Sequence, residues 1–240
     1  MALYSDEGIV LRTAKLGEAD RIITLFTRGH GKVRAVAKGV RRTKSRFGAR
    51  LEPFMRVSLL LAEGRSLDSV SQAESIAAYA GSISGDYEAY RAANVICETL
   101  NDLVTTEHEP QPAQYRLIVG ALHALAARVH HAQTICESYV LRALALAGWT
   151  PRLHACVVCG RADDGLTFFS SAAGGAMCTA DHTPEARPVS AGVLRQLRAL
   201  LDGDWRTLDA QPLEPGTERL VEDWAQYYLE RPIRSLRLLD

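Results

Sequence analysis

The clearest structural signal in the chain is the run Lys32-Val33-Arg34-Ala35-Val36-Ala37. Its small apolar residues alternate with a second set that includes Lys32 and Arg34, so that one face of an extended segment would be apolar throughout. A period of two residues is that of a β-strand with one buried face. Gly31 and Gly39 bound the run and are typical turn residues. The run therefore predicts a strand that places basic side chains opposite a buried face.

Similar short runs, rich in β-branched and apolar residues, surround this strand. They lie at residues 9–11, 21–26 and 56–61, with a weaker one at 69–76. Five short strands within the first third of the chain favour a small closed barrel, and the OB-fold is the five-stranded form of such a barrel. An SH3-like barrel is the alternative that this pattern leaves open.

The period changes to that of helices after Gly85. Asp86 is a suitable N-cap, and the apolar positions that follow, from Tyr90 through Ile96 to Leu100, recur every three or four residues as one buried stripe requires. We therefore predict a multidomain β + α protein, with an OB-fold domain at 1–81 and an α-helical domain at 82–240. Further helices are expected at 113–130, 133–147, 191–201 and 218–230.

The overall charge conceals a strong asymmetry along the chain. All 240 residues carry 28 basic and 28 acidic side chains, but residues 1–80 carry 14 basic against 8 acidic ones, a net charge of +6. Between Arg28 and Arg56 there are ten basic residues and one acidic residue, Glu52. A nearly unopposed basic run of this length is typical of a surface that binds a polyanion.

A set of metal ligands interrupts the helical half. Cys156 and Cys159 form a C-x2-C pair, and Cys178 follows after 18 residues, a separation typical of paired zinc knuckles. We expect an insertion at about 153–184 that holds one structural Zn²⁺ per chain. The predicted fourth ligand is His182, because imidazole is the softer donor, and Asp181 is the alternative.

The motifs of the common enzyme classes are missing. The chain has no phosphate-binding loop, no dinucleotide-binding glycine motif, no zinc-protease helix and no nucleophile elbow, so we expect no enzyme. The longest apolar stretch, 117–129, is interrupted by polar residues and is too short for a membrane span. The start of the chain does not resemble an export signal, which favours a cytoplasmic protein without membrane partners.

Several stretches in the first part of the chain resemble the bacterial recombination mediator family RecO. They are Gly8-Ile9-Val10-Leu11, Gly17-Glu18-Ala19-Asp20, Gly29-His30-Gly31-Lys32, Ala37-Lys38-Gly39-Val40-Arg41 and Leu51-Glu52-Pro53-Phe54. The resemblance implies an opening OB-fold and a helical half with an inserted zinc knuckle. It also implies a protein that binds single- and double-stranded DNA and anneals complementary strands without a nucleotide.

The same resemblance implies partners in the RecF pathway of DNA repair and recombination. These are RecR and the C-terminal tail of the single-stranded DNA-binding protein (SSB), with a functional link to RecA, which would be loaded onto SSB-coated strands. Association with the nucleoid during repair would follow. The alternative is a regulatory or protein-interaction module whose basic strip binds an acidic partner or RNA.

The expected DNA contacts come from the basic run and from one aromatic ring within it. Phe47 is the one ring of the loop that we expect to stack on a base, because Phe26 and Phe54 fit the core. With so few rings, contacts to the phosphate backbone would dominate and leave the bases free to pair. The full predicted set is Lys32, Arg34, Lys38, Arg41, Arg42, Lys44, Arg46, Phe47 and Arg50.

Overall fold

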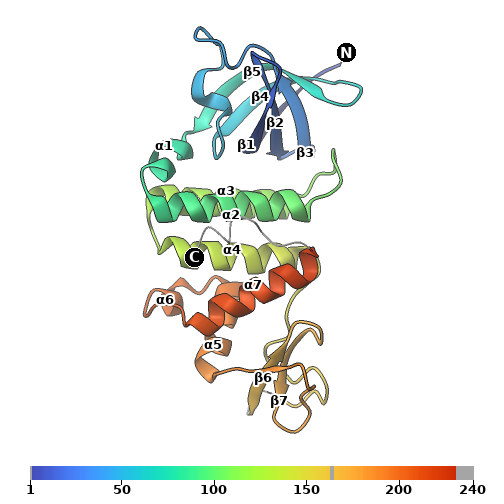
Figure 1. Cartoon of the computed structure of the whole chain (residues 1–240), viewed down its shortest axis with the longest axis vertical. Coiled ribbons are helices and arrows are strands. Elements are labelled where there is room, and N and C mark those ends of the chain that lie inside the picture. The colour runs from blue at the N-terminus through green and yellow to red at the C-terminus, as the bar shows by residue number, and fades with distance from the viewer. Residues whose placement is uncertain (1, 163–164, 231–240) are drawn as a thin grey trace. The chain divides into compact units, whose positions relative to one another are not determined.

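The structure is a computed structural model that describes residues 2–162 and 165–230 (Figure 1). It divides into two compact units that meet in the sequence between Val129 and His130, and each unit is described by itself. The predicted boundary between residues 81 and 82 falls inside the first helix, which runs from Tyr79 to Ser84, and the compact first unit extends beyond it to Val129.

The first unit begins with a closed barrel of five strands, in the order β1-β2-β3-β5-β4 (Figure 1). The barrel closes where β1 pairs with β4, and β5 joins β3 through a short parallel pairing. This OB-fold-like barrel followed by helices confirms the predicted fold class. The strands are β1 (Leu3–Leu16), β2 (Asp20–Thr27), β3 (Gly31–Ala37), β4 (Arg56–Ala62) and β5 (Asp68–Ala77).

The alternation read from the sequence sets which side chains fill the barrel. Val33, Ala35 and Ala37 of β3 are fully buried, while Arg34 between them is exposed. The barrel core also takes in residues that lie outside the strands, including Leu51 of the short 3-10 helix η1 (Gly48–Leu51). The long segment between β3 and β4 is therefore attached to the barrel through its own apolar side chains.

Three helices complete the first unit: α1 (Tyr79–Ser84), α2 (Tyr87–Leu103) and α3 (Pro112–Ala127). The Asp86 carboxylate accepts a hydrogen bond of 3.1 Å from the Ala89 N–H, which confirms the predicted N-cap of α2. Most of the predicted stripe of α2 is buried, but Tyr90 is 46% exposed, contrary to our expectation. Tyr90 lies one turn from the start of the helix, where its ring reaches the edge of the packed face.

Strand β3 is tied to the segment that follows α2. The Lys32 ammonium donates to the carbonyls of Asn101 and Val104, at 2.8 and 3.0 Å, and so satisfies the C-terminal end of the helix. Gly31 has a φ of +63°, and a Cβ at this position would lie 1.9 Å from the carbonyl oxygen of Glu109. Only glycine permits so close an approach of the two backbones.

The second unit combines helices with a small sheet of three strands in the order β7-β6-β8 (Figure 1). Trp224 is almost fully buried in its core and donates from Nε1 to the carbonyl of Trp149. The first two strands of the sheet lie in the insertion, predicted at about 153–184, that we expected to hold a zinc ion, and the third strand follows it. The elements are α4 (Ala132–Leu146), β6 (Leu166–Ser170), β7 (Gly175–Cys178), β8 (Arg187–Pro188), α5 (Ala191–Asp202), α6 (Trp205–Leu208) and α7 (Pro215–Leu229).

No helix in the described ranges is both long enough and apolar enough to span a bilayer.

Candidate functional site

The segment between β3 and β4, residues 38–50, carries most of the predicted DNA-binding residues. Six basic side chains of this segment are exposed, and no carboxylate among the described residues lies within ion-pair distance of any of them. We call these six side chains the basic loop set; they are Lys38, Arg41, Arg42, Lys44, Arg46 and Arg50.

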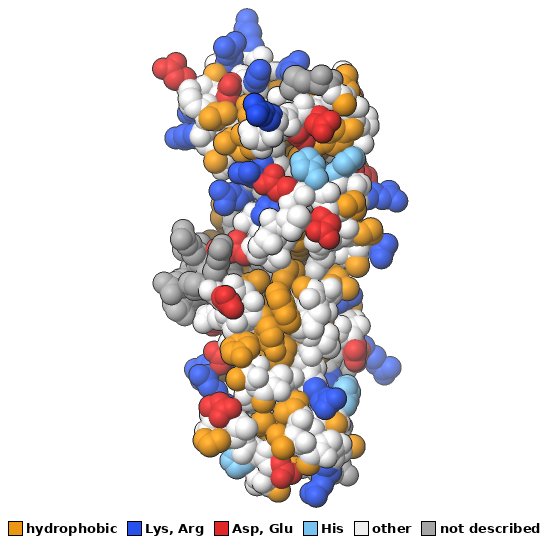
Figure 2. Space-filling view, turned by 90° about the vertical axis from the view of Figure 1, so that its right-hand side faces the viewer, with side chains coloured by type: hydrophobic (Ala, Val, Ile, Leu, Met, Phe, Trp, Pro, Cys, Tyr) orange, Lys and Arg blue, Asp and Glu red, His pale blue; other side chains and the backbone are white. Residues whose placement is uncertain are grey.

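Two members of the set are held in place by backbone carbonyls. The Arg41 guanidinium donates to the carbonyl of Glu18 at 2.9 Å, and Arg50 donates to the carbonyls of Arg46 and Phe47 at 3.1 and 3.3 Å. These hydrogen bonds leave the positive charge without an opposite charge beside it. Figure 2 shows basic side chains projecting from the barrel region on one face, with acidic and hydrophobic ones between them. The basic loop set is thus a locally uncompensated positive surface.

The two basic residues of strand β3 are engaged within the protein. Lys32 is half-buried at the end of α2, and its desolvation lowers the pKa of its ammonium, with the nearby Glu107 acting in the opposite direction. Arg34 is exposed, but its Nε contacts the Glu107 carboxylate. Both residues were predicted to bind DNA, and the structure gives each of them an intramolecular partner.

The expectation that Phe47 offers its ring to a base is wrong. Its side chain is 1% exposed and belongs to the barrel core, with the Arg46 guanidinium 4.8 Å from its ring centroid. A loop has no regular period, so no pattern in the chain indicated which way this ring would face. Phe26 and Phe54, which we expected in the core, are buried as predicted.

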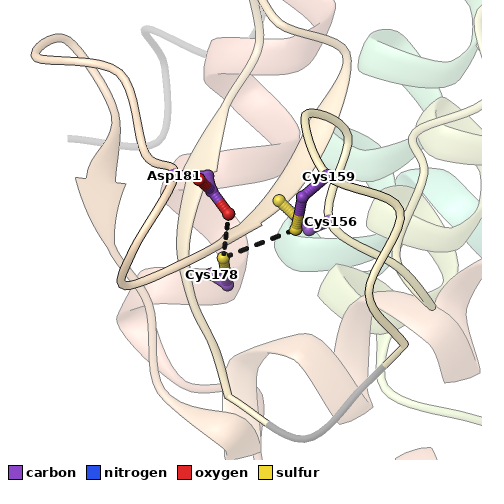
Figure 3. A group of neighbouring side chains, drawn as sticks. All are labelled: Cys156, Cys159, Cys178 and Asp181. Atoms are coloured by element: carbon purple, nitrogen blue, oxygen red, sulfur yellow. Dashed lines mark hydrogen bonds between the residues drawn. The ribbon is translucent and has the colours of Figure 1, made fainter.

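A cluster of three thiols and one carboxylate lies in the second unit (Figure 3). Cys156 and Cys159 come from the turn before β6, Cys178 ends β7, and Asp181 follows in the next turn. All four ligand atoms lie within 4.8 Å of one another, and the sulfurs of Cys159 and Cys178 are 3.8 Å apart. Two thiolates on a tetrahedral Zn²⁺, each about 2.3 Å from the ion, are separated by about 3.8 Å. The spacing therefore fits zinc.

The electrostatics of the cluster differ among its members. A hydrogen bond from the Arg161 backbone acts to lower the pKa of the Cys159 thiol, but its hydrogen bonds with Asp181 and the other two cysteines, together with burial, raise this pKa to about 11, whereas two other groups favour their charged forms. Burial acts to raise the pKa of the Cys156 thiol, but hydrogen bonds from the backbone N–H groups of Cys159, Cys178 and Val158 outweigh it and bring this pKa down to about 7. Hydrogen bonds from the two neighbouring thiols lower the pKa of Asp181. Thiolate and carboxylate are the forms that bind metal.

The fourth member of this cluster is Asp181, and the predicted ligand His182 lies outside it. The Nδ1 atom of His182 is 2.9 Å from the carbonyl oxygen of Thr179, and its ring is stacked on Phe168 with centroids 3.8 Å apart. Asp181 lies three residues after Cys178, where a second C-x2-C knuckle would have a cysteine. Its carboxylate is 3.2 Å from the Cys178 sulfur. The alternative ligand is therefore the one that the fold brings together with the cysteines.

Comparison with known proteins covers nearly the whole chain. Residues 1–79 match the family model "Recombination protein O N terminal", and residues 84–237 match "Recombination protein O C terminal". The chain belongs to the RecO family. The resemblance noted from the sequence is thereby confirmed, and with it a role in DNA repair and recombination.

Curated relatives show the same similarity. A DNA repair protein RecO of Bifidobacterium longum is 67% identical over 240 residues, which is all of both chains. The RecO proteins of Streptomyces avermitilis and a Nocardioides species are 47% and 44% identical, and these alignments cover at least 99% of each chain. The similarity therefore extends through the barrel, the helices and the cysteine-containing insertion alike.

Proposed function

We propose that this chain is a DNA-binding recombination mediator that uses the basic loop set to bind the phosphates of single- and double-stranded DNA. Six exposed cations without carboxylate partners among the described residues, on an OB-fold-like barrel of the RecO family, are the observation that carries this proposal. Binding through the backbone releases counterions and leaves the base edges accessible. Complementary strands held in this way can pair, and no covalent bond is made or broken.

The proposed partners follow from the family. With RecR, the chain would promote loading of RecA onto single strands coated by SSB, and it would contact the C-terminal tail of SSB. One Zn²⁺ held by Cys156, Cys159, Cys178 and Asp181 would stabilise the insertion without taking part in a reaction. Its four protein ligands would leave no open position for a substrate.

Charge reversal in the basic loop set tests the DNA contact. One variant would carry glutamate in place of four members of the set, Lys38, Arg42, Lys44 and Arg46. We expect this variant to lose affinity for all DNA sequences alike. Each phosphate that the variant no longer neutralises should flatten the slope of log affinity against log salt by about 0.7 on single strands and about 0.9 on duplex. Fluorescence anisotropy with labelled oligonucleotides at several salt concentrations measures both quantities.

The matched control carries the same change in net charge elsewhere. Arg65, Arg116, Arg195 and Arg219 are exposed and lie outside the basic loop set, so their reversal to glutamate should leave most of the salt slope intact. Equal losses in the two folded variants would mean that net charge alone drives binding, against the proposal. Tighter binding of the unchanged protein to RNA or to an acidic peptide than to DNA would favour the interaction-module alternative.

A further inference from the structure

An apolar groove of about 550 Å³ opens on the first unit beside the basic loop set. Its walls come from the segment around η1, from the start of α1 and from α2. Small and apolar residues line most of it, among them Ala49, Pro53, Ala80 and Gly81. The Glu52 carboxylate at its edge is paired with Arg21 at 2.7 Å, so the groove does not present a free acid at that point.

Two aromatic rings give this groove a fixed wall. The half-exposed Tyr90 ring meets Phe54 edge to face, with centroids 5.8 Å apart and planes 85° apart. Phe54 has a φ of +70°, which is rare for a bulky residue and costs energy. Its N–H donates to the carbonyl of Val10 at 2.9 Å, which ties this strained residue to β1. The barrel thus maintains an unfavourable backbone conformation at the point where Phe54 supports Tyr90.

Basic residues that are close in the chain to one wall of the groove indicate the class of its ligand. Ala49 lines the groove, and it lies in the chain between Arg46 and Arg50, two members of the basic loop set. A ligand that suits both features has a flat apolar part for the groove and negative charge for the arginines. A nucleotide within a DNA strand has both.

We propose that the groove receives one unstacked base of a single DNA strand, which packs against Tyr90 while the adjoining phosphates lie on Arg46 and Arg50. This inference rests on the proposed function and adds to it a preference for single-stranded over duplex DNA. A base in a duplex must first be unpaired and unstacked, at a cost of a few kcal/mol, before it can enter. The groove therefore favours single strands, whereas the cations alone bind both forms.

Removal of the Tyr90 ring tests the proposal, with three DNA probes of equal length. They are an oligothymidine of about 16 nucleotides, a strand of the same length made of abasic sugar-phosphate units, and a duplex. Tyr90→Ala should weaken oligothymidine binding at least about fivefold, the worth of one stacked base, and change duplex and abasic-strand binding by less than about twofold. Tyr90→Phe should retain the binding, because the ring remains.

Two further variants separate the groove from the surface around it. Tyr87 lies three residues earlier in α2, is 67% exposed and does not line the groove, so Tyr87→Ala should bind all three probes as the unchanged protein does. Gly81 also lines the groove, and a Cβ added there would meet no other atom within 4 Å. Gly81→Leu should therefore add a bulky side chain at the groove and reproduce the loss caused by Tyr90→Ala.

The possible results distinguish this inference from the proposed function. Equal effects of Tyr90→Ala on oligothymidine and on the abasic strand would overturn the base pocket, as would full binding by Gly81→Leu. If the charge-reversed variant still loses its affinity in either case, DNA binding by the basic loop set stands and only the groove proposal falls. If the unchanged protein binds none of the three probes, the proposed function itself is wrong.

Discussion

The place of Asp181 in its turn, more than chemical softness, decides which side chain joins the cysteine cluster. It lies three residues after Cys178, the same separation that joins Cys156 and Cys159, so its side chain enters the cluster from the same kind of turn. His182 is one residue further along, and its ring packs on Phe168 instead. The sequence contained both candidates, and the preference for imidazole favoured the one that lies outside the cluster.

We therefore expect the zinc content to depend on Asp181 and not on His182. The purified chain should contain one equivalent of Zn²⁺ by elemental analysis. Asp181→Ala should lower that content or make the metal easier to remove with a chelator, and His182→Ala should retain it. Cys159→Ser should remove a ligand and destabilise the insertion, because binding of the metal is part of the folding free energy there.

Zinc retained by Asp181→Ala but lost from His182→Ala would mean that the histidine turns into the site when metal binds. Less than one equivalent in the unchanged protein after careful purification would count against a structural zinc altogether.

At the scale of elements, the helices α4 and α7 enclose a carboxyl group that the sequence pattern did not single out. Glu137 of α4 is 4% exposed, and Gln133 donates a hydrogen bond of 2.5 Å to it. Burial raises the pKa of Glu137 to about 8, and the charges of Glu218 and Glu222 on α7 act in the same direction. The carboxyl group is thus protonated in the folded protein at neutral pH.

This raised pKa predicts a loss of stability as the pH increases. In the unfolded chain the group ionises near pH 4.5, whereas in the folded chain it holds its proton up to about pH 8. Unfolding releases a proton between these values, so the free energy of unfolding should fall from about pH 4.5 to pH 8 and level off above that. Glu137→Gln should remove most of this decline and raise the Tm at pH 8 more than at pH 5.

Thermal unfolding at several pH values, followed by circular dichroism, measures the effect. Asp202→Asn is a suitable control, because Asp202 is an exposed carboxylate on α5 of the same unit. If Glu137→Gln shows the same decline of Tm with pH as the unchanged protein, Glu137 is ionised in the folded state.

The short helices α1 and α6 were not predicted, whereas the longer helices and the barrel strands were predictable from their periods. Strand β3 and the buried stripe of α2 are examples, and the cap at Asp86 followed from its residue type. Tyr90 has the same spacing as the buried residues of its helix, so no periodicity could show that its ring is exposed. The sheet β7-β6-β8 was missed because its strands are only two to five residues long.

At the scale of the whole molecule, charge and chemistry predict how the chain would anneal DNA. If it binds phosphates as proposed, the basic loop set would reduce the repulsion between two strands, and no nucleotide-binding motif is present in the sequence to supply energy. Annealing of complementary oligonucleotides should therefore be fastest at low salt, slow steeply above physiological salt and show no response to ATP. A strand-pairing assay with a fluorescence-quencher pair measures the rate, on bare strands and on SSB-coated ones.

An annealing rate that requires ATP, or one that survives charge reversal of the basic loop set in a folded variant, would contradict this mechanism. The family and its role in DNA repair could be inferred from sequence alone, since the matching stretches span the first domain. The surfaces that would contact the proposed partners RecR and SSB could not be inferred, because no motif in the chain identifies them.

The contacts of Gly31 and Lys32 bear on how the protein folds as it leaves the ribosome. The last barrel strand ends at Ala77, but Lys32 needs the carbonyls at the end of α2, and Gly31 lies against the backbone of Glu109. A nascent chain that has released only its strands therefore lacks both the acceptors of the Lys32 ammonium and the backbone that Gly31 approaches. These contacts can form only after about 30 further residues have emerged, so translation itself sets the order in which this end of the barrel gains its contacts with the helix that follows.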